Sequence, residues 1–207
     1  MLINMKRGFT VVEVIVTMVV ITVILSLGTV GLRASLANGR DAERQADIAA
    51  IAQGLEERYN NGNALEALPG PPYWYDKKGR KSYPGVNEFI HMQGSQRSGF
   101  TPETVSNGYF TDNLPGTSLS SLTTPSGNRI GQVCVYACQP AGNEAQLQSA
   151  YNGAQGIDRY IYEAIDRNGN ICSNGTCVAY NLYWVKETDP TTTKGIPGLQ
   201  IVKSKHQ

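Results

Sequence analysis

The chain has 207 residues, which fits one ordinary domain plus an appendage better than two large domains. Its 18 basic and 17 acidic side chains nearly balance, so nucleic acid or an acidic membrane surface would have to bind through a local patch. Hydrophobic residues make up 41% of the chain and gather near the N-terminus, ahead of a remainder rich in Gly, Ser, Asn and Tyr.

An apolar segment follows a short basic N-terminus. Between residues 9 and 27 the only charged residue is Glu13, and about 20 residues of helix at about 1.5 Å each cross a hydrocarbon core of about 30 Å. Lys6 and Arg7 precede the segment with no acidic neighbour, which predicts a cytoplasmic N-terminus and an outward-facing remainder. A cleaved secretory signal peptide is the alternative, because residues 28–31 offer small side chains after the apolar run.

Residues 5–13 read MKRGFTVVE and lead into the apolar segment. This stretch resembles the class III signal of type IV prepilins and pseudopilins, in which a basic leader ends in glycine and an aromatic residue and a glutamate follow. The resemblance implies that a prepilin peptidase cleaves between Gly8 and Phe9 and that Phe9 becomes N-methylated. It also implies that the apolar helix stays in the mature protein.

Glu13 is an ionisable residue inside the predicted span, where such a group costs about 2.5 to 3.5 kcal/mol unless it has a partner or a role. Cleavage after Gly8 would create a positively charged amino group on Phe9. In the family that the chain resembles, this glutamate is thought to neutralise the amino terminus of a neighbouring subunit during assembly. The alternative is that Glu13 lies near the interface of a plain signal anchor and reaches water.

One helix is predicted from residue 9 to residue 59. Its second half is amphipathic, and one stripe of this half is expected to pack on a globular head. The stripe consists of Ile48, Ile51, Ala52, Leu55 and Tyr59, and the charged residues assigned to other faces are Asp41, Arg44, Asp47 and Glu57. Asn60, Asn61 and Gly62 are expected to end the helix.

Gly28 and Gly31 weaken the helix where the apolar block ends. Two interpretations remain open for this place. The helix unwinds locally when subunits pack in a filament, or the small residues allow close packing between helices.

The expected fold is α+β, with a long N-terminal spine helix packed on a small antiparallel β-sheet head, and it resembles the pilin architecture. The expected divisions are a leader at 1–8, a transmembrane or filament-core segment at 9–31, an amphipathic helix at 32–60 and a head at 61–207. Within the head, a proline-rich loop region is expected at 61–128 and the antiparallel sheet at 129–207. Strands are predicted at 132–136, 159–165, 177–185 and 199–203.

Four cysteines fit a disulfide framework if the head is exported, namely Cys134, Cys138, Cys172 and Cys177. The sequence CSNGTC at 172–177 predicts a type I′ hairpin that places its two cysteines opposite each other. Bonding within the other pair requires the chain between them to bend, since four residues of strand span about 13 Å. Cross-pairing between the two pairs is the alternative, and the spacing and an oxidising location disfavour zinc.

Asp166, Asn168 and Asn170 around Gly169 offer alternate oxygen ligands for calcium. The twelfth position of an EF-hand loop needs a bidentate glutamate, and Cys177 stands there instead. A plain hairpin turn is therefore favoured, and no metal site is predicted.

A segment at 71–85, PPYWYDKKGRKSYPG, mixes aromatic and basic side chains, which suits DNA or a surface glycan. The alternative is a solvated loop. The candidate binding residues are Tyr73, Trp74, Tyr75, Lys77, Lys78, Arg80 and Lys81.

No nucleophile motif, phosphate loop or paired acid system is apparent, so we expect neither an enzyme nor a cofactor. The leading hypothesis is a structural subunit of a type IV pilus that supports adhesion, motility or DNA uptake. It would be a single-pass membrane protein with a cytoplasmic N-terminus and an outer head, and then part of an extracellular filament. Its partners would be its own copies, other pilins, prepilin peptidase, the inner-membrane assembly platform and, before assembly, membrane lipid. The alternatives are a pseudopilin of a type II secretion system and a membrane-anchored binding protein that does not polymerise.

Overall fold

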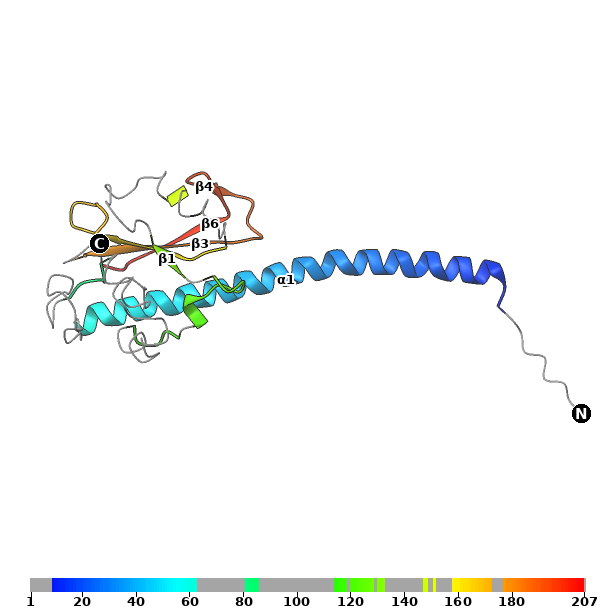
Figure 1. Ribbon diagram of the computed structural model, residues 1–207, viewed down its shortest axis with the longest axis horizontal. Helices are drawn as coiled ribbons and strands as arrows, with labels where there is room; N and C mark the ends of the chain where they lie inside the picture. Colours follow the sequence, from blue (N-terminus) through cyan, green and yellow to red (C-terminus); the bar gives the residue numbers. More distant parts are fainter. Residues whose placement is uncertain are drawn as a thin grey trace, which may run out of the picture. The chain divides into compact units, whose positions relative to one another are not determined.

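The computed structural model describes residues 9–62, 81–85, 114–118, 120–128, 130–132, 147–148, 151, 158–172 and 177–206. The fold is α+β, with one long helix and small β-sheets (Figure 1). The chain divides into two compact units, Met1–Gly39 and Arg40–Gln207, and the boundary falls inside the helix. We call the first the N-terminal unit and the second the head.

Helix α1 runs over Val11–Asn61, close to the predicted bounds. Gly62 follows it with a φ of 71°, a left-handed conformation that glycine adopts without the penalty a Cβ would bring. The expected stop at Asn60, Asn61 and Gly62 is confirmed. The helix also runs unbroken through Gly28 and Gly31, and local unwinding in a filament stays a prediction.

The main sheet has the strand order β1-β2-β3-β6. Strands β2 (Ile161–Ile165), β3 (Ala179–Val185) and β6 (Leu199–Lys203) are antiparallel and lie within the predicted ranges. β1 (Gly131–Gln132) pairs with β2 in parallel, which differs from the expected all-antiparallel sheet. The reason is topological: β2 comes next in the chain after the long segment 133–160, and such a connection allows a crossover where a tight hairpin does not.

Three shorter elements complete the described head. They are the 3₁₀ helix η2 (Ser120–Leu122) and the two-stranded hairpin of β4 (Thr192–Thr193) and β5 (Ile196–Pro197). Residues 114–118 cross α1 at Gly54, where a Cβ atom would lie 3.0 Å from the Pro115 carbonyl oxygen. This close approach explains a glycine in the middle of a helix.

The predicted helix stripe packs into the head core. Ile48, Ile51 and Leu55 are buried, and Ala52 and Tyr59 are partly buried against them. The core is rich in tyrosine, and several of its phenols hydrogen-bond to carboxylates, which satisfies the polar end of a buried ring. The phenols with such a bond are Tyr83 and Tyr180 (to Glu56), Tyr160 (to Asp47) and Tyr183 (to Glu163). Burial, and then the neighbouring carboxylate, raises the pKa of these four phenols.

Strand β3 packs on both of its faces. Tyr180, Leu182 and Trp184 on one face are buried, and so is Tyr183 on the other. On that second face, Lys194 of the β4–β5 hairpin lies 5.4 Å from the centre of the Tyr183 ring. Both faces of the sheet are therefore covered at β3.

Candidate functional site

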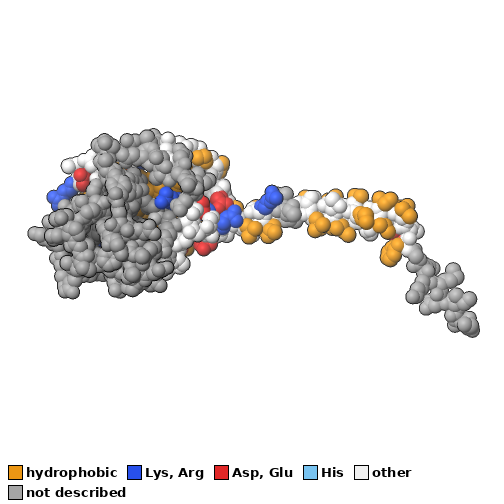
Figure 2. All heavy atoms as spheres, viewed as in Figure 1, with side chains coloured by type: hydrophobic (Ala, Val, Ile, Leu, Met, Phe, Trp, Pro, Cys, Tyr) orange, Lys and Arg blue, Asp and Glu red, His pale blue; other side chains and the backbone are white. Residues whose placement is uncertain are grey.

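The first residues of the described chain expose a large apolar surface. Phe9 is 85% exposed, and the large apolar side chains from Val11 to Leu27 are 41% to 76% exposed (Figure 2). An 18-residue window of α1 has a mean hydropathy of 2.6, and none of it is buried within the structure. The core helix of a soluble protein would be mostly buried, so this segment is available to a bilayer or to other protein chains.

Glu13 and Thr10 form a capping box at the start of α1. The Glu13 amide donates to Thr10 Oγ1 (3.2 Å), and Glu13 Oε2 accepts from the Thr10 amide (3.1 Å) and hydroxyl (3.2 Å). These reciprocal bonds satisfy backbone donors that a helix start leaves without partners. Sequence reasoning singled out Glu13 but not Thr10, although the spacing T-x-x-E is a known signal for this motif.

The capping box uses only one of the two carboxylate oxygens of Glu13. Within the described residues, Oε1 has no hydrogen-bond partner. A carboxylate has about four acceptor sites, so Glu13 can cap its own helix and still accept from a second donor.

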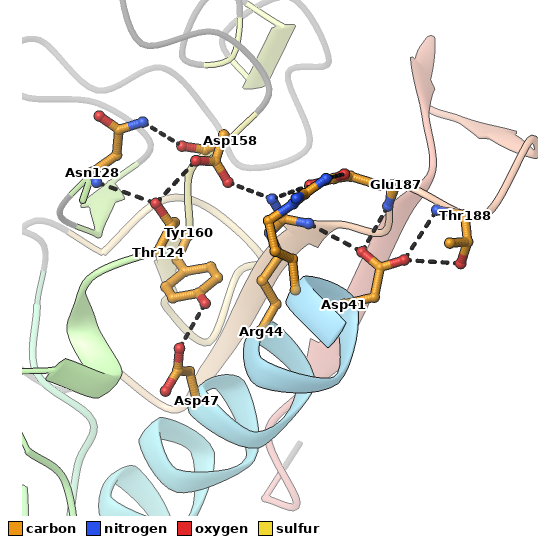
Figure 3. Close-up of polar contacts among 10 residues, drawn as sticks. Asp41, Arg44, Asp47, Thr124, Asn128, Asp158, Tyr160, Glu187 and Thr188 are labelled. Atoms are coloured by element: carbon orange, nitrogen blue, oxygen red, sulfur yellow. Dashed lines mark hydrogen bonds and ion pairs between the residues drawn. The ribbon is translucent and has the colours of Figure 1, made fainter. Parts of the chain in front are cut away.

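A second polar cluster lies in the head, where charged residues of α1 meet the segment after β3 (Figure 3). We call it the ion-pair network, and its members are Arg40, Asp41, Arg44, Asp158 and Glu187. Arg44 contacts three acids: Asp41 at 3.0 Å, Asp158 at 2.8 Å and Glu187 at 2.5 Å. Arg40 adds a two-pronged pair with Glu187, at 2.6 and 3.0 Å.

Asp41 also binds backbone directly. Its Oδ1 accepts from the Glu187 amide (2.8 Å), and its Oδ2 accepts from the Thr188 amide (3.0 Å) and hydroxyl (2.8 Å). Asp41 and Arg44 are both 4% exposed, which corrects the expectation that they simply occupy other faces of the helix. A buried charge needs close partners, and these come from far along the chain.

The network shifts the titration of its acids. Hydrogen bonds from Arg40, and after them from Arg44, lower the pKa of Glu187 to about 2. Burial alone would raise the pKa of Asp41, but the amides of Glu187 and Thr188 outweigh it and the pKa is lowered. Both carboxylates are therefore charged at neutral pH, as their partners require.

The disulfide predicted within CSNGTC is present. Cys172 bonds to Cys177, with a Cα–Cα distance of 5.6 Å. Residues 173–176, which contain the predicted turn, lie outside the described residues. Cys134 and Cys138 also lie outside them, so their pairing stays a prediction.

Residues 166–170 form a turn between Ile165 and Ile171, which pair with each other, and the absence of a metal there stays a prediction. Asp166 Oδ1 accepts from the amides of Asn168 and Asn170, each at 2.8 Å, and Gly169 has a φ of 80°. The carboxylate thus binds backbone. The described residues contain no group of three or more His, Cys, Asp or Glu side chains that could hold a metal ion.

Most of the candidate binding segment at 71–85 lies outside the described residues. The candidate residues outside them are Tyr73, Trp74, Tyr75, Lys77, Lys78 and Arg80. Gly8, at the predicted cleavage site, also lies outside the described residues. Lys81 is described and exposed. Tyr83 belongs instead to the core: it is fully buried, and its amide donates to the Cys177 carbonyl at 2.9 Å.

Comparison with known proteins adds one finding, at the N-terminus. The family model of the prokaryotic N-terminal methylation motif matches residues 3–29. The chain therefore carries the class III prepilin signal of type IV pilins and pseudopilins. That signal marks structural proteins processed by prepilin peptidase rather than enzymes, and α1 fits the single-pass membrane anchor of such a protein. No curated protein and no solved structure matches the chain.

Proposed function

We propose that this chain is a subunit of a type IV pilus that polymerises through the N-terminal part of α1. The observation that carries the proposal is the exposed apolar surface between Phe9 and Leu27, directly behind a prepilin signal. Prepilin peptidase cleaves between Gly8 and Phe9, and Phe9 is then N-methylated. Before assembly the apolar surface contacts membrane lipid, and afterwards it contacts the helices of other subunits.

Glu13 selects the position of the neighbouring subunit in this proposal. Its Oε2 belongs to the capping box, and its Oε1 accepts the charged amino group of Phe9 on the next subunit. An uncompensated carboxylate in an apolar filament core is costly, so subunits that miss this contact dissociate.

Mass spectrometry of the mature N-terminus tests processing. A chain that begins with N-methylated Phe9 is expected. An intact Met1 in the membrane fraction would rule out the pilin and pseudopilin proposals together and leave a membrane-anchored binding protein.

A pair of variants separates the charge of Glu13 from its capping role. Glu13→Gln keeps an oxygen that can accept from the Thr10 amide but loses the charge, whereas Thr10→Val loses the cap and keeps the charge. We expect normal processing in both, filaments from Thr10→Val and few or none from Glu13→Gln. Electron microscopy of sheared surface filaments checks this, and the reverse result would assign Glu13 to capping alone.

No contact among the described residues of the head distinguishes adhesion from motility or DNA uptake. The candidate binding segment at 71–85 remains the proposed contact for DNA or a glycan. Replacing Lys77, Lys78, Arg80 and Lys81 with alanine is expected to weaken DNA binding in a gel-shift assay with the full chain. Unchanged binding would remove that role and leave the assembly proposal intact.

A further inference from the structure

Strand β6 forms one edge of the main sheet. Two backbone bonds show which of its residues pair with β3: the Ser204 amide donates to the Tyr180 carbonyl (3.0 Å), and the Lys186 amide donates to the Gly198 carbonyl (2.9 Å). Pairing alternates along an antiparallel strand. The amides and carbonyls of Ile201 and Lys203 therefore point away from β3.

These outward groups have no partner in the described part of the chain. β6 runs for five residues, whereas β1 at the opposite edge has two. A strand edge of this length with unpaired amides and carbonyls is a template on which another extended segment can add.

The charges along this edge differ from one end to the other. Lys203 and Lys205 at the C-terminal end are exposed. Asp189 lies near the other end, where its Oδ2 accepts from the Gln200 side chain at 2.8 Å. Glu56, near the basic end, is buried and accepts from the Lys205 amide and from two tyrosines. His206 Nε2 lies 3.5 Å from its Oε2. An incoming strand with acidic side chains next to Lys203 and Lys205 matches this pattern.

We propose that the outer edge of β6 binds an extended acidic segment of a partner protein by β-strand addition. Ile201 and Lys203 supply the backbone hydrogen bonds, and Lys203 and Lys205 select acidic side chains. The proposal uses only the head and does not depend on polymerisation through α1.

Amide hydrogen exchange of the full chain in detergent micelles tests it with two synthetic peptides. Both carry the alternating core Thr-Val-Thr-Val-Thr, one flanked by glutamates and the other by lysines. We expect the acidic peptide at millimolar concentration to slow exchange at Ile201 and Lys203 about tenfold, and the basic peptide to leave it unchanged.

Two variants make the test specific to the edge. Ile201→Pro removes an outward amide without removing a bond to β3, and is expected to abolish the slowing at Lys203. Lys203→Glu leaves the backbone unchanged and, because Lys205 remains, is expected to remove the preference between the peptides. This keeps the test valid if the proline variant does not fold.

Three results would each overturn the proposal. One is that neither peptide slows exchange at the edge, in which case Lys203 serves to keep the edge unpaired. Another is equal slowing by both peptides. The third is slowing that rises with protein concentration and needs no peptide, which would assign the edge to a second copy of this chain.

Discussion

The two parts of helix α1 have opposite surroundings. From Val11 to Leu27 its large apolar side chains are exposed, whereas in the head Ile48, Ile51 and Leu55 are at most 1% exposed. Hydrophobicity alone therefore does not predict burial within a subunit. The more apolar part has no partner in the described chain, and its surface is available for lipid or other copies. The less apolar part is covered by its own sheet.

The charged residues of the N-terminal unit and of the head differ in the same way. Glu13 is exposed and hydrogen-bonds only locally, within its own helix turn. Asp41 and Arg44 are buried and bind residues more than a hundred positions away. The N-terminal unit thus leaves Glu13 exposed, while the head pairs Asp41 and Arg44 internally.

The largest expected effect comes from breaking the ion-pair network. Arg44→Met leaves three acids without their shared cation, and removing one partner from a buried pair costs about 3 to 5 kcal/mol. Urea denaturation followed by the fluorescence of buried Trp184 measures the loss. Gln45→Met, on the exposed face next to it, is the control and should stay within about 0.5 kcal/mol of the parent. A loss below about 1 kcal/mol for Arg44→Met would show that the network does not hold the head part of α1 to Asp158 and Glu187.

The second-largest expected effect is a loss of head stability at low pH. Glu187 has its pKa lowered from 4.5 to about 2, so it contributes stability above about pH 4.5 that is lost as the pH falls towards 2. The lowered pKa of Asp41 acts in the same direction, whereas burial raises the pKa of Asp47, which acts oppositely. With allowance for solvent screening, we expect the head to lose about 1 to 2 kcal/mol over this range.

The variant Glu187→Gln tests this assignment, because it removes the titrating carboxyl. The free energy of unfolding should then change less between pH 4.5 and pH 2 than it does in the parent. Glu57→Gln, in an acid that bonds only to Gln53 among the described contacts, is the matched control and should keep the slope of the parent. Equal slopes for Glu187→Gln and the parent would contradict the assignment.

The smallest effect is confined to the N-terminal unit. Thr10→Val removes the cap and should destabilise the first helix turn by about 1 kcal/mol. Amide exchange at Glu13, whose amide donates to Thr10 Oγ1, should then become about fivefold faster, with head stability unchanged. Thr17→Val, whose hydroxyl bonds to a carbonyl one turn earlier, leaves the cap in place and should not accelerate that exchange.

Features that depend on neighbouring residues could be predicted from the sequence. Gly62 ended the helix where expected, and the three longest strands lie in the predicted ranges. The pairing of Cys172 with Cys177 was predicted from the sequence of the four residues between them. The Thr10–Glu13 capping box is equally readable from its T-x-x-E spacing, because both residues lie in one helix turn.

By itself, then, the sequence determined the processing signal, the extent of α1, the local disulfide and the apolar segment, because each depends on spacing or composition within a few turns. Only the tertiary structure decided that Arg44 is buried, since Asp158 and Glu187 lie 114 and 143 residues further along the chain. The same holds for the parallel pairing of β1, the cover on both faces of β3 and the place of β6 at one edge of the main sheet. Each of these depends on which distant segments fold against one another, and no local pattern encodes that choice.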